Sequence, residues 1–274
     1  MIKSEFSNTT ELHQRLQSDQ NADQTTDWKT LQCELDDGPA PRASIGLIAL
    51  ASDSVIEPEL RRFLPIDGVG MHVNRIPMPK VVSIDTLGGM AEDIASTTHG
   101  LMPDGRLDVI AFGCTSGAMT IGAAKVAELI QKARPGVSCT DPISAGLKGL
   151  RALGCRRIGL ITPYVDSVNR VVENYIREQG MEIVVKGSFN QAGDPQICRI
   201  PPNAILEAGA QLKEADIDAL FVSCTALRTS SIIQKLESTL GKPVVASNQA
   251  LAWDCLRLSG FTDPVEGYGQ LLRI

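Results

Sequence analysis

The sequence from Leu107 to Ser116 reads LDVIAFGCTS, and it returns from Ile217 to Ala226 as IDALFVSCTA, 110 residues further on. Both stretches are short aliphatic runs that end in a Cys-Thr pair. Such runs are typical of strands buried on both faces of a parallel sheet. The recurrence predicts one structural unit that the chain uses twice.

A second landmark repeats at nearly the same offset. The letters IGLI occupy Ile45–Ile48 within ASIGLIALAS and, 113 residues later, Ile158–Ile161 within RRIGLITPYV. Each Cys-Thr pair precedes a helix-like stretch, Gly117–Lys132 in the first copy and Arg228–Leu240 in the second. A Pro/Gly break and another β-rich run follow each stretch (VSCTDP; VVASNQ). This alternation of strands and helices indicates a βαβ unit that occurs twice in the chain.

The pattern predicts an α/β fold of two pseudo-symmetric lobes, each a parallel sheet flanked by helices. We expect an N-terminal extension over 1–43, because that stretch is polar with little apolar periodicity. The first lobe should comprise 44–145 plus 250–274, and the second 146–249. Ligands of such sheets bind beyond the carboxyl ends of the strands, so the active site is expected in the cleft between the lobes.

Composition narrows the class of protein. The 274 residues are 43% hydrophobic and 21% charged, with a net charge of −6 and no run of Lys or Arg. The broad basic surface that nucleic acid or an anionic membrane requires is missing, so neither partner is expected. No stretch reaches eighteen apolar residues and the N-terminus lacks the apolar core of a signal peptide, which predicts a cytoplasmic protein.

The chain has seven cysteines and no C-x-x-C pair, which argues against a disulfide framework and against a zinc site. A lone cysteine that ends a buried strand is more often a packing residue than a catalytic one. Equivalent placement in two repeats favours function for Cys114 and Cys224. We interpret the other five as structural: Cys33, Cys139, Cys155, Cys198 and Cys255.

The two repeated cysteines should meet in the cleft. Each is expected at the beginning of a helix, where free backbone N–H groups favour a thiolate and can also hold a carboxylate or an enolate oxygen. Short neighbouring side chains leave these amides open and add hydroxyl donors: Thr115, Ser116, Gly117 and Thr225. One thiolate and one thiol on opposite sides of a carbon acid could move a proton from one face to the other.

At these residues the chain resembles a known family. GCTSGAMTIG, LITPYVDSVNRVVENYIREQG, SCTALRT and GKPVVASNQALAWDCLRLSG are similar to motifs of maleate isomerases and arylmalonate decarboxylases, a branch of the aspartate/glutamate racemase superfamily. The likeness covers about Ala43 to Gly260. The opening LIALASDSVIEPELRR is most similar to the racemase-like proteins of ectoine utilisation.

The resemblance implies an aspartate/glutamate racemase-like fold that works without a metal or an organic cofactor. In maleate isomerases one cysteine adds to the substrate double bond and the other donates a proton, whereas arylmalonate decarboxylases keep only the second. The presence of both disfavours such a decarboxylase. Carried over by motif, Cys114 is the nucleophile or first-face base and Cys224 the opposite acid/base. Tyr164 matches a tyrosine that hydrogen-bonds a substrate carboxylate, although a helix-capping ring is an equal alternative.

Two positions depart from the maleate isomerase pattern. Ser52-Asp53 stands where that family has Ser-Asn, and Asp194, in GDPQICR, aligns with a second asparagine. An ionised aspartate cannot donate to a substrate carboxylate and suits an ammonium or amide N–H instead. The alternatives are a helix cap for Asp53 and a simple turn for Asp194. Ser247, at the start of SNQ, either lines the pocket or caps the next helix, and we favour the cap.

The leading hypothesis is a cofactor-independent isomerase: a racemase or epimerase of a small carboxylate, for which the resemblance suggests an ectoine-derived N-acetyl-2,4-diaminobutyrate. Its closest rival is a maleate-type cis-trans isomerase that works by covalent cysteine addition. A non-catalytic small-molecule binding protein is a more distant alternative. A homodimer or higher homo-oligomer is expected, as is usual for acidic enzymes of this size.

Overall fold

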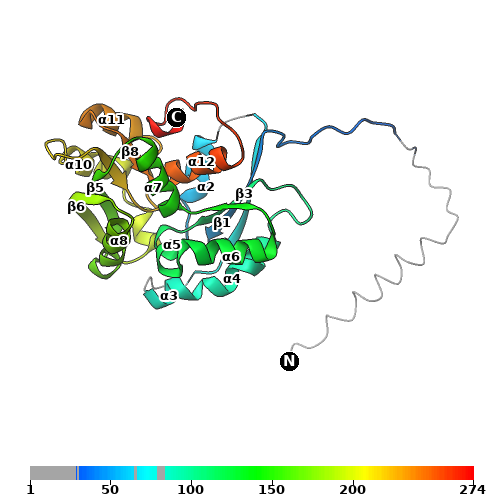
Figure 1. Ribbon diagram of the computed structural model, residues 1–274, viewed down its shortest axis with the longest axis horizontal. Coiled ribbons are helices and arrows are strands. Elements are labelled where there is room, and N and C mark those ends of the chain that lie inside the picture. The colour runs from blue at the N-terminus through cyan, green and yellow to red at the C-terminus, as the bar shows by residue number, and fades with distance from the viewer. Residues whose placement is uncertain (1–28, 30, 65–66, 79–83) are drawn as a thin grey trace. The chain divides into compact units, whose positions relative to one another are not determined.

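The computed structural model describes residues 29, 31–64, 67–78 and 84–274. The chain forms two units, Met1–Asp36 and Asp37–Ile274. The few described residues of the first unit contain no helix or strand. Most of the expected extension over 1–43 therefore lies outside the described residues. The strands and helices of the second unit are shown in Figure 1.

The first sheet contains four parallel strands in the order β2-β1-β3-β4. They are β1 (Ala43–Leu50), β2 (Val69–Ile76), β3 (Val109–Gly113) and β4 (Ser138–Thr140). Every residue of β1 and β3 is buried, as their unbroken aliphatic sequences indicate.

The second sheet repeats this plan with four parallel strands in the order β6-β5-β7-β8. They are β5 (Arg157–Tyr164), β6 (Glu182–Gln191), β7 (Ala219–Val222) and β8 (Val244–Ala246). The repeat extends to the pairing register, because Ile45 faces Val109 in the first sheet and Ile158 faces Ala219 in the second. The predicted α/β fold with two duplicated parallel sheets is confirmed.

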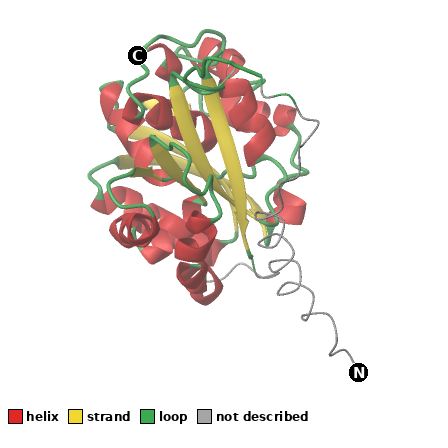
Figure 2. Cartoon of the chain, turned by 90° about the vertical axis from the view of Figure 1, so that its right-hand side faces the viewer, coloured by secondary structure: helices red, strands yellow, loops and turns green. Residues whose placement is uncertain are grey.

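Helices pack against both sheets (Figure 2). Their bounds are α2 (Ile56–Phe63), α3 (Ile84–Gly89), α4 (Ala91–His99), α5 (Thr115–Ile121), α6 (Ala123–Ala133), α7 (Pro142–Ala152), α8 (Asp166–Glu178), α9 (Asp194–Ile197), α10 (Pro202–Ala210), α11 (Ile233–Leu240) and α12 (Ser247–Leu258), with a final 3₁₀ turn η1 (Leu271–Arg273). Close packing shows at α7, where a Cβ added at Gly146 would lie 2.8 Å from the Phe221 ring of β7. Within the described residues, no helix is both long enough and apolar enough to span a membrane.

Both helices predicted after the Cys-Thr pairs are corrected by the structure. The stretch Gly117–Lys132 is not one helix, because Gly122 adopts φ 92° and separates α5 from α6. The stretch Arg228–Leu240 is helical only from Ile233, and turns precede it. The backbone amides of Thr229 and Ser230 are bonded to a distant carboxylate, so this segment needs no helical hydrogen bonds to satisfy them.

Candidate active site

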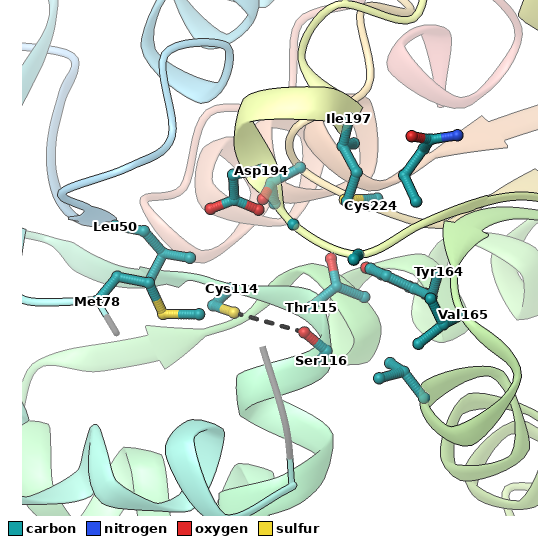
Figure 3. A pocket seen from close by; sticks show the side chains of 15 residues that line it. Leu50, Met78, Cys114, Thr115, Ser116, Tyr164, Val165, Asp194, Ile197 and Cys224 are labelled. Carbon is teal, nitrogen blue, oxygen red and sulfur yellow. Dashed lines mark hydrogen bonds between the residues drawn. The ribbon is translucent and has the colours of Figure 1, made fainter. Parts of the chain in front are cut away.

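A pocket lies where strands of both sheets end (Figure 3). The first half of the chain contributes Leu50, Met78, Cys114, Thr115 and Ser116 to its lining. The second half contributes residues that include Tyr164, Gly193, Asp194, Ile197, Cys224 and Thr225. The two repeated cysteines thus line one pocket from different sides, each just beyond the central portion of its own sheet.

Cys114 follows β3 and is the N-cap of α5. Its Sγ accepts a hydrogen bond from the Gly117 backbone N–H at 3.2 Å and lies 3.8 Å from the Ser116 Oγ. A Cβ at position 117 would stand 2.9 Å from this sulfur, so only glycine fits without a shift. Burial raises the pKa of the Cys114 thiol to about 12, although the Gly117 N–H and Ser116 lower it.

This pKa reverses one expectation from the sequence. The helix start does stabilise the thiolate, but desolvation outweighs that effect. At pH 7 a pKa of about 12 leaves about one Cys114 in 10⁵ as thiolate, against a few per cent for an ordinary cysteine. Cys114 is therefore a neutral thiol at pH 7 and a potential proton donor.

Cys224 occupies the matching position after β7 but does not begin a helix. Turns follow it, and the backbone N–H of Ala226 and the hydroxyl of Tyr164 lie close enough to act on its sulfur. Both lower the pKa of the thiol, yet burial raises that pKa well above its ordinary value. A turn thus replaces the predicted helix N-terminus as the source of a backbone donor.

Tyr164 ends β5 and is buried in the pocket lining. Burial raises the pKa of its hydroxyl well above the usual range, and the neighbouring Cys224 raises it further. The hydroxyl therefore stays protonated beside the Cys224 sulfur. The structure thus gives Tyr164 a role beside Cys224 that the sequence did not suggest, in addition to its place in the lining.

Asp194 begins the short helix α9 and lines the pocket. Its Oδ2 accepts a hydrogen bond from the Ser52 Oγ at 2.5 Å, which joins the segments that follow β1 and β6. Burial raises the pKa of Asp194, and the Ser52 hydroxyl lowers it. Its charge also raises the pKa of both cysteines, so the carboxylate acts on each sulfur. Ser52 itself is exposed and contributes through Asp194.

The N-cap of α2 is Val55, so the cap that the sequence suggested for Asp53 is wrong. Asp53 Oδ1 instead accepts the backbone N–H groups of Val55 at 2.7 Å and Ile56 at 2.9 Å, and it holds the turn that leads into α2. Its Oδ2 is buried without a hydrogen-bonding partner among the described residues, although Thr225 lies near enough to lower the carboxyl pKa. Burial nevertheless raises that pKa overall. Asp53 is not among the described lining residues, whereas Asp194 is.

The SNQ segment lies behind the pocket. Thr115 Oγ1 donates to Ser247 Oγ at 3.3 Å, and Asn248 Nδ2 donates to the Thr225 carbonyl at 2.7 Å. The N-cap of α12 is Ala246, so the cap predicted for Ser247 is wrong. Asn248 supports Thr225 from behind, a contact that sequence alone could not reveal because it joins segments 23 residues apart.

Several apolar lining residues were not anticipated, among them Leu50, Met78 and Ile197. They carry no distinguishing signal, because an aliphatic residue that lines a pocket looks like a core residue in sequence. Within the described part of the chain, no three His, Cys, Asp or Glu side chains lie where they could share a metal ion.

The chain is similar in sequence and fold to known proteins. The sequence model of the arylmalonate decarboxylase family matches residues 54–272. The arylmalonate decarboxylase of Bordetella bronchiseptica is 31% identical over 230 residues, which cover 79% of this chain and 94% of that protein. The maleate isomerase of Nocardia farcinica is 28% identical over 242 residues, 84% of this chain and 95% of that protein. A solved Nocardia farcinica maleate cis-trans isomerase, a Cys-to-Ser mutant with a covalently bound succinylcysteine intermediate, gives a TM-score of 0.76 at 25% identity, covering 84% of this chain and 98% of that one.

Proposed function

Since the chain belongs to the arylmalonate decarboxylase family, we propose that it is a cofactor-independent racemase or epimerase of a small carboxylate. The observation that carries the proposal is the placement of Cys114 and Cys224 in one pocket, one from each repeat. Two thiols on different sides of a substrate suit removal of a proton from one face and delivery to the other.

Burial raises the pKa of both cysteines, so the proposed chemistry begins when one thiol gives its proton to solvent water. The resulting thiolate takes the proton alpha to the substrate carboxylate, and the opposite thiol gives its proton to the other face. The cysteines exchange protonation states, and the substrate leaves with inverted configuration. Gly117 N–H stabilises a thiolate at Cys114, whereas Ala226 N–H and Tyr164 do so at Cys224.

The remaining lining residues suggest how the substrate is oriented. We propose that Ser116 and Thr225, through their hydroxyl groups, and the neighbouring Thr115 bind the substrate carboxylate and the developing enolate oxygen. Asp194 presents a carboxylate to the pocket, and only one of its oxygens accepts the Ser52 hydroxyl. The other oxygen suits an ammonium or amide N–H.

This polarity favours an amino acid or an acylated diamino acid. Together with the likeness of LIALASDSVIEPELRR to the ectoine-utilisation proteins, it leads us to propose N-acetyl-2,4-diaminobutyrate as the substrate. A substrate with a second carboxylate in place of the ammonium or amide group would be repelled by the negative charge of Asp194, which weakens its binding.

Single replacements test the two-base assignment. We expect Cys114→Ala and Cys224→Ala each to lower turnover by at least about 10³-fold, because neither face can exchange its proton without a thiol. Turnover is followed by chiral chromatography of N-acetyl-2,4-diaminobutyrate. Cys255→Ala, at a buried cysteine outside the pocket, is the matched control and should retain activity. Full activity in either active-site variant would remove that cysteine from the mechanism.

A maleate-type cis-trans isomerase is the second candidate, favoured by the likeness to the Nocardia farcinica structure with its succinylcysteine. In this reaction the Cys114 thiolate adds to the substrate double bond and the other carbon gains a proton. After rotation about the new single bond, that proton leaves and the C–S bond breaks. Incubation of Cys224→Ser with maleate, followed by intact-protein mass spectrometry, would reveal the adduct. A racemase leaves no such adduct.

A further inference from the structure

Glu59 is a buried carboxylate far in sequence from the groups that it contacts. It lies on α2, where its side chain is 2% exposed. Its Oε2 accepts hydrogen bonds from the Thr229 backbone N–H at 2.8 Å, the Thr229 hydroxyl at 3.0 Å and the Ser230 backbone N–H at 2.8 Å. Its Oε1 accepts the Ser230 hydroxyl at 2.6 Å.

These contacts satisfy a group that would otherwise be costly to bury. An ionised carboxylate out of water is tolerated when several donors and a counter-charge surround it. Arg62, on the same helix, supplies the charge with its Nη1 at 3.6 Å from Glu59 Oε1, and it also donates to the Ser230 Oγ at 3.1 Å. The bonds to a charged acceptor are stronger than bonds between neutral groups.

The segment held in this way is the one that carries Cys224. It runs from the end of β7 through residues 223–230, and a regular helix begins only at Ile233. Its backbone amides at Thr229 and Ser230 therefore depend on Glu59 for a partner. Asp53, in the segment just before α2, has its carboxyl beside Thr225. The Cys224 turn is thus contacted by Glu59 of α2 at Thr229 and Ser230, and by the segment before α2 at Thr225.

We propose that Glu59 is a positioning residue: through Thr229 and Ser230 it holds the Cys224 turn so that the sulfur stays buried between the Ala226 N–H and Tyr164. The assignment rests on the proposed function insofar as Cys224 takes part in the chemistry. The geometric claim stands apart from turnover, because it concerns the burial and reactivity of one sulfur.

Replacement of Glu59 by alanine removes the acceptor of four hydrogen bonds and should make the Cys224 turn more mobile. Burial is the largest cause that raises the Cys224 pKa, so exposure of the sulfur lowers that pKa and admits reagents. Glu59→Gln should behave nearly as the native protein, because its carbonyl oxygen can take the place of Oε2 and its amide can donate to the Ser230 hydroxyl. Glu57→Gln, on the same helix in an ion pair with Arg75, is the matched control.

The experiment measures the rate of iodoacetamide alkylation at Cys224 and Cys114 by peptide mass spectrometry from pH 7 to 10. In Glu59→Ala we expect Cys224 to react at least about tenfold faster, with its pH profile displaced downward by about one unit or more. Cys114 should change less than about twofold, and both cysteines should behave natively in Glu59→Gln and Glu57→Gln. If Glu59→Ala does not fold, Ser230→Ala removes one of the four bonds and should displace the Cys224 profile in the same direction.

An unchanged Cys224 profile in a folded Glu59→Ala protein would overturn the proposal, as would equal changes at both cysteines. If Glu59→Ala is unfolded, an unchanged Cys224 profile in Ser230→Ala would overturn it as well. Failure of the proposed function is distinguishable, because it would show as native turnover in Cys224→Ala and leave the alkylation profiles unaffected.

Discussion

Asp53 and Asp194 carry the same charge beside the pocket but occupy different environments. Asp53 is buried and its Oδ1 accepts backbone N–H groups at the start of α2, whereas Asp194 lines the pocket and accepts the Ser52 hydroxyl. Both have raised pKa values because of burial, and both raise the pKa of Cys114 and Cys224. Their different contacts lead to separate predictions, one about specificity and one about stability.

Asp194 should determine which substrates bind. We expect Asp194→Asn to lower kcat/KM for N-acetyl-2,4-diaminobutyrate by about tenfold or more, because a charged acceptor for its N–H group is replaced by a neutral one. The same change should strengthen binding of a dicarboxylate such as maleate, since the amide can donate to a carboxylate. Steady-state kinetics and competition by maleate measure both effects. Parallel losses for the two ligands would contradict a role in specificity.

Asp53 should act on stability through its two backbone hydrogen bonds before α2. Asp53→Ala is expected to lower the free energy of unfolding by about 1 kcal/mol, because these N–H groups lose their acceptor, whereas Asp53→Asn keeps an acceptor oxygen. Because burial raises the pKa of the folded carboxyl above 3.8, the folded protein holds this proton more tightly than the unfolded chain. The stability that this carboxyl contributes is fully present below about pH 3.8 and is lost as pH rises through the raised value.

Urea denaturation at pH 4 and pH 7 tests whether the stability contributed by the Asp53 carboxyl falls as pH rises. Relative to the native protein, Asp53→Asn should gain stability between pH 4 and pH 7. A difference that stays constant over this range would show that Asp53 titrates alike in the folded and unfolded states.

Among the elements, the break between α5 and α6 is the clearest departure from the sequence pattern. Gly122 adopts φ 92° and ψ 126°, where an L side chain is strained although the space around it is open. The break leaves α5 as a separate short helix behind Cys114. Apolar periodicity continues through this position, so periodicity alone could not reveal the break.

Replacement of this glycine should be costly for backbone reasons alone. Gly122→Ala is expected to destabilise the protein by about 1–3 kcal/mol. Gly88→Ala, in α3 with open space around it and no positive φ, should be neutral or slightly stabilising. Thermal unfolding of the two variants measures the contrast. Equal stabilities would show that α5 and α6 tolerate a continuous helix.

For the whole molecule, the duplicated sequence was enough to predict two matching parallel sheets. Unbroken aliphatic runs predict buried strands such as β1 and β7, and the repeat shows that the two halves are equivalent. The same repeat identified Cys114 and Cys224 as the candidate catalytic cysteines. The turn after Cys224 could not be predicted, because its amides are satisfied by Glu59, 170 residues away in sequence.

The same limit applies to the raised pKa values in the pocket. A local motif predicts the hydrogen bond at Cys114, but desolvation depends on every segment that covers the sulfur. Sequence therefore identified two cysteines of the pocket lining and could not give their resting protonation. Burial keeps both as neutral thiols, so the proposed reaction first requires one of them to give its proton to solvent water.

The most direct test of the two-base proposal is proton NMR of the native protein with N-acetyl-2,4-diaminobutyrate in deuterium oxide. We expect loss of the alpha-proton signal as solvent deuterium enters, together with formation of the opposite enantiomer. Aspartate and maleate, followed in parallel, serve as comparison substrates. An unexchanged alpha proton together with conversion of maleate to fumarate would contradict the racemase and establish the cis-trans isomerase in its place.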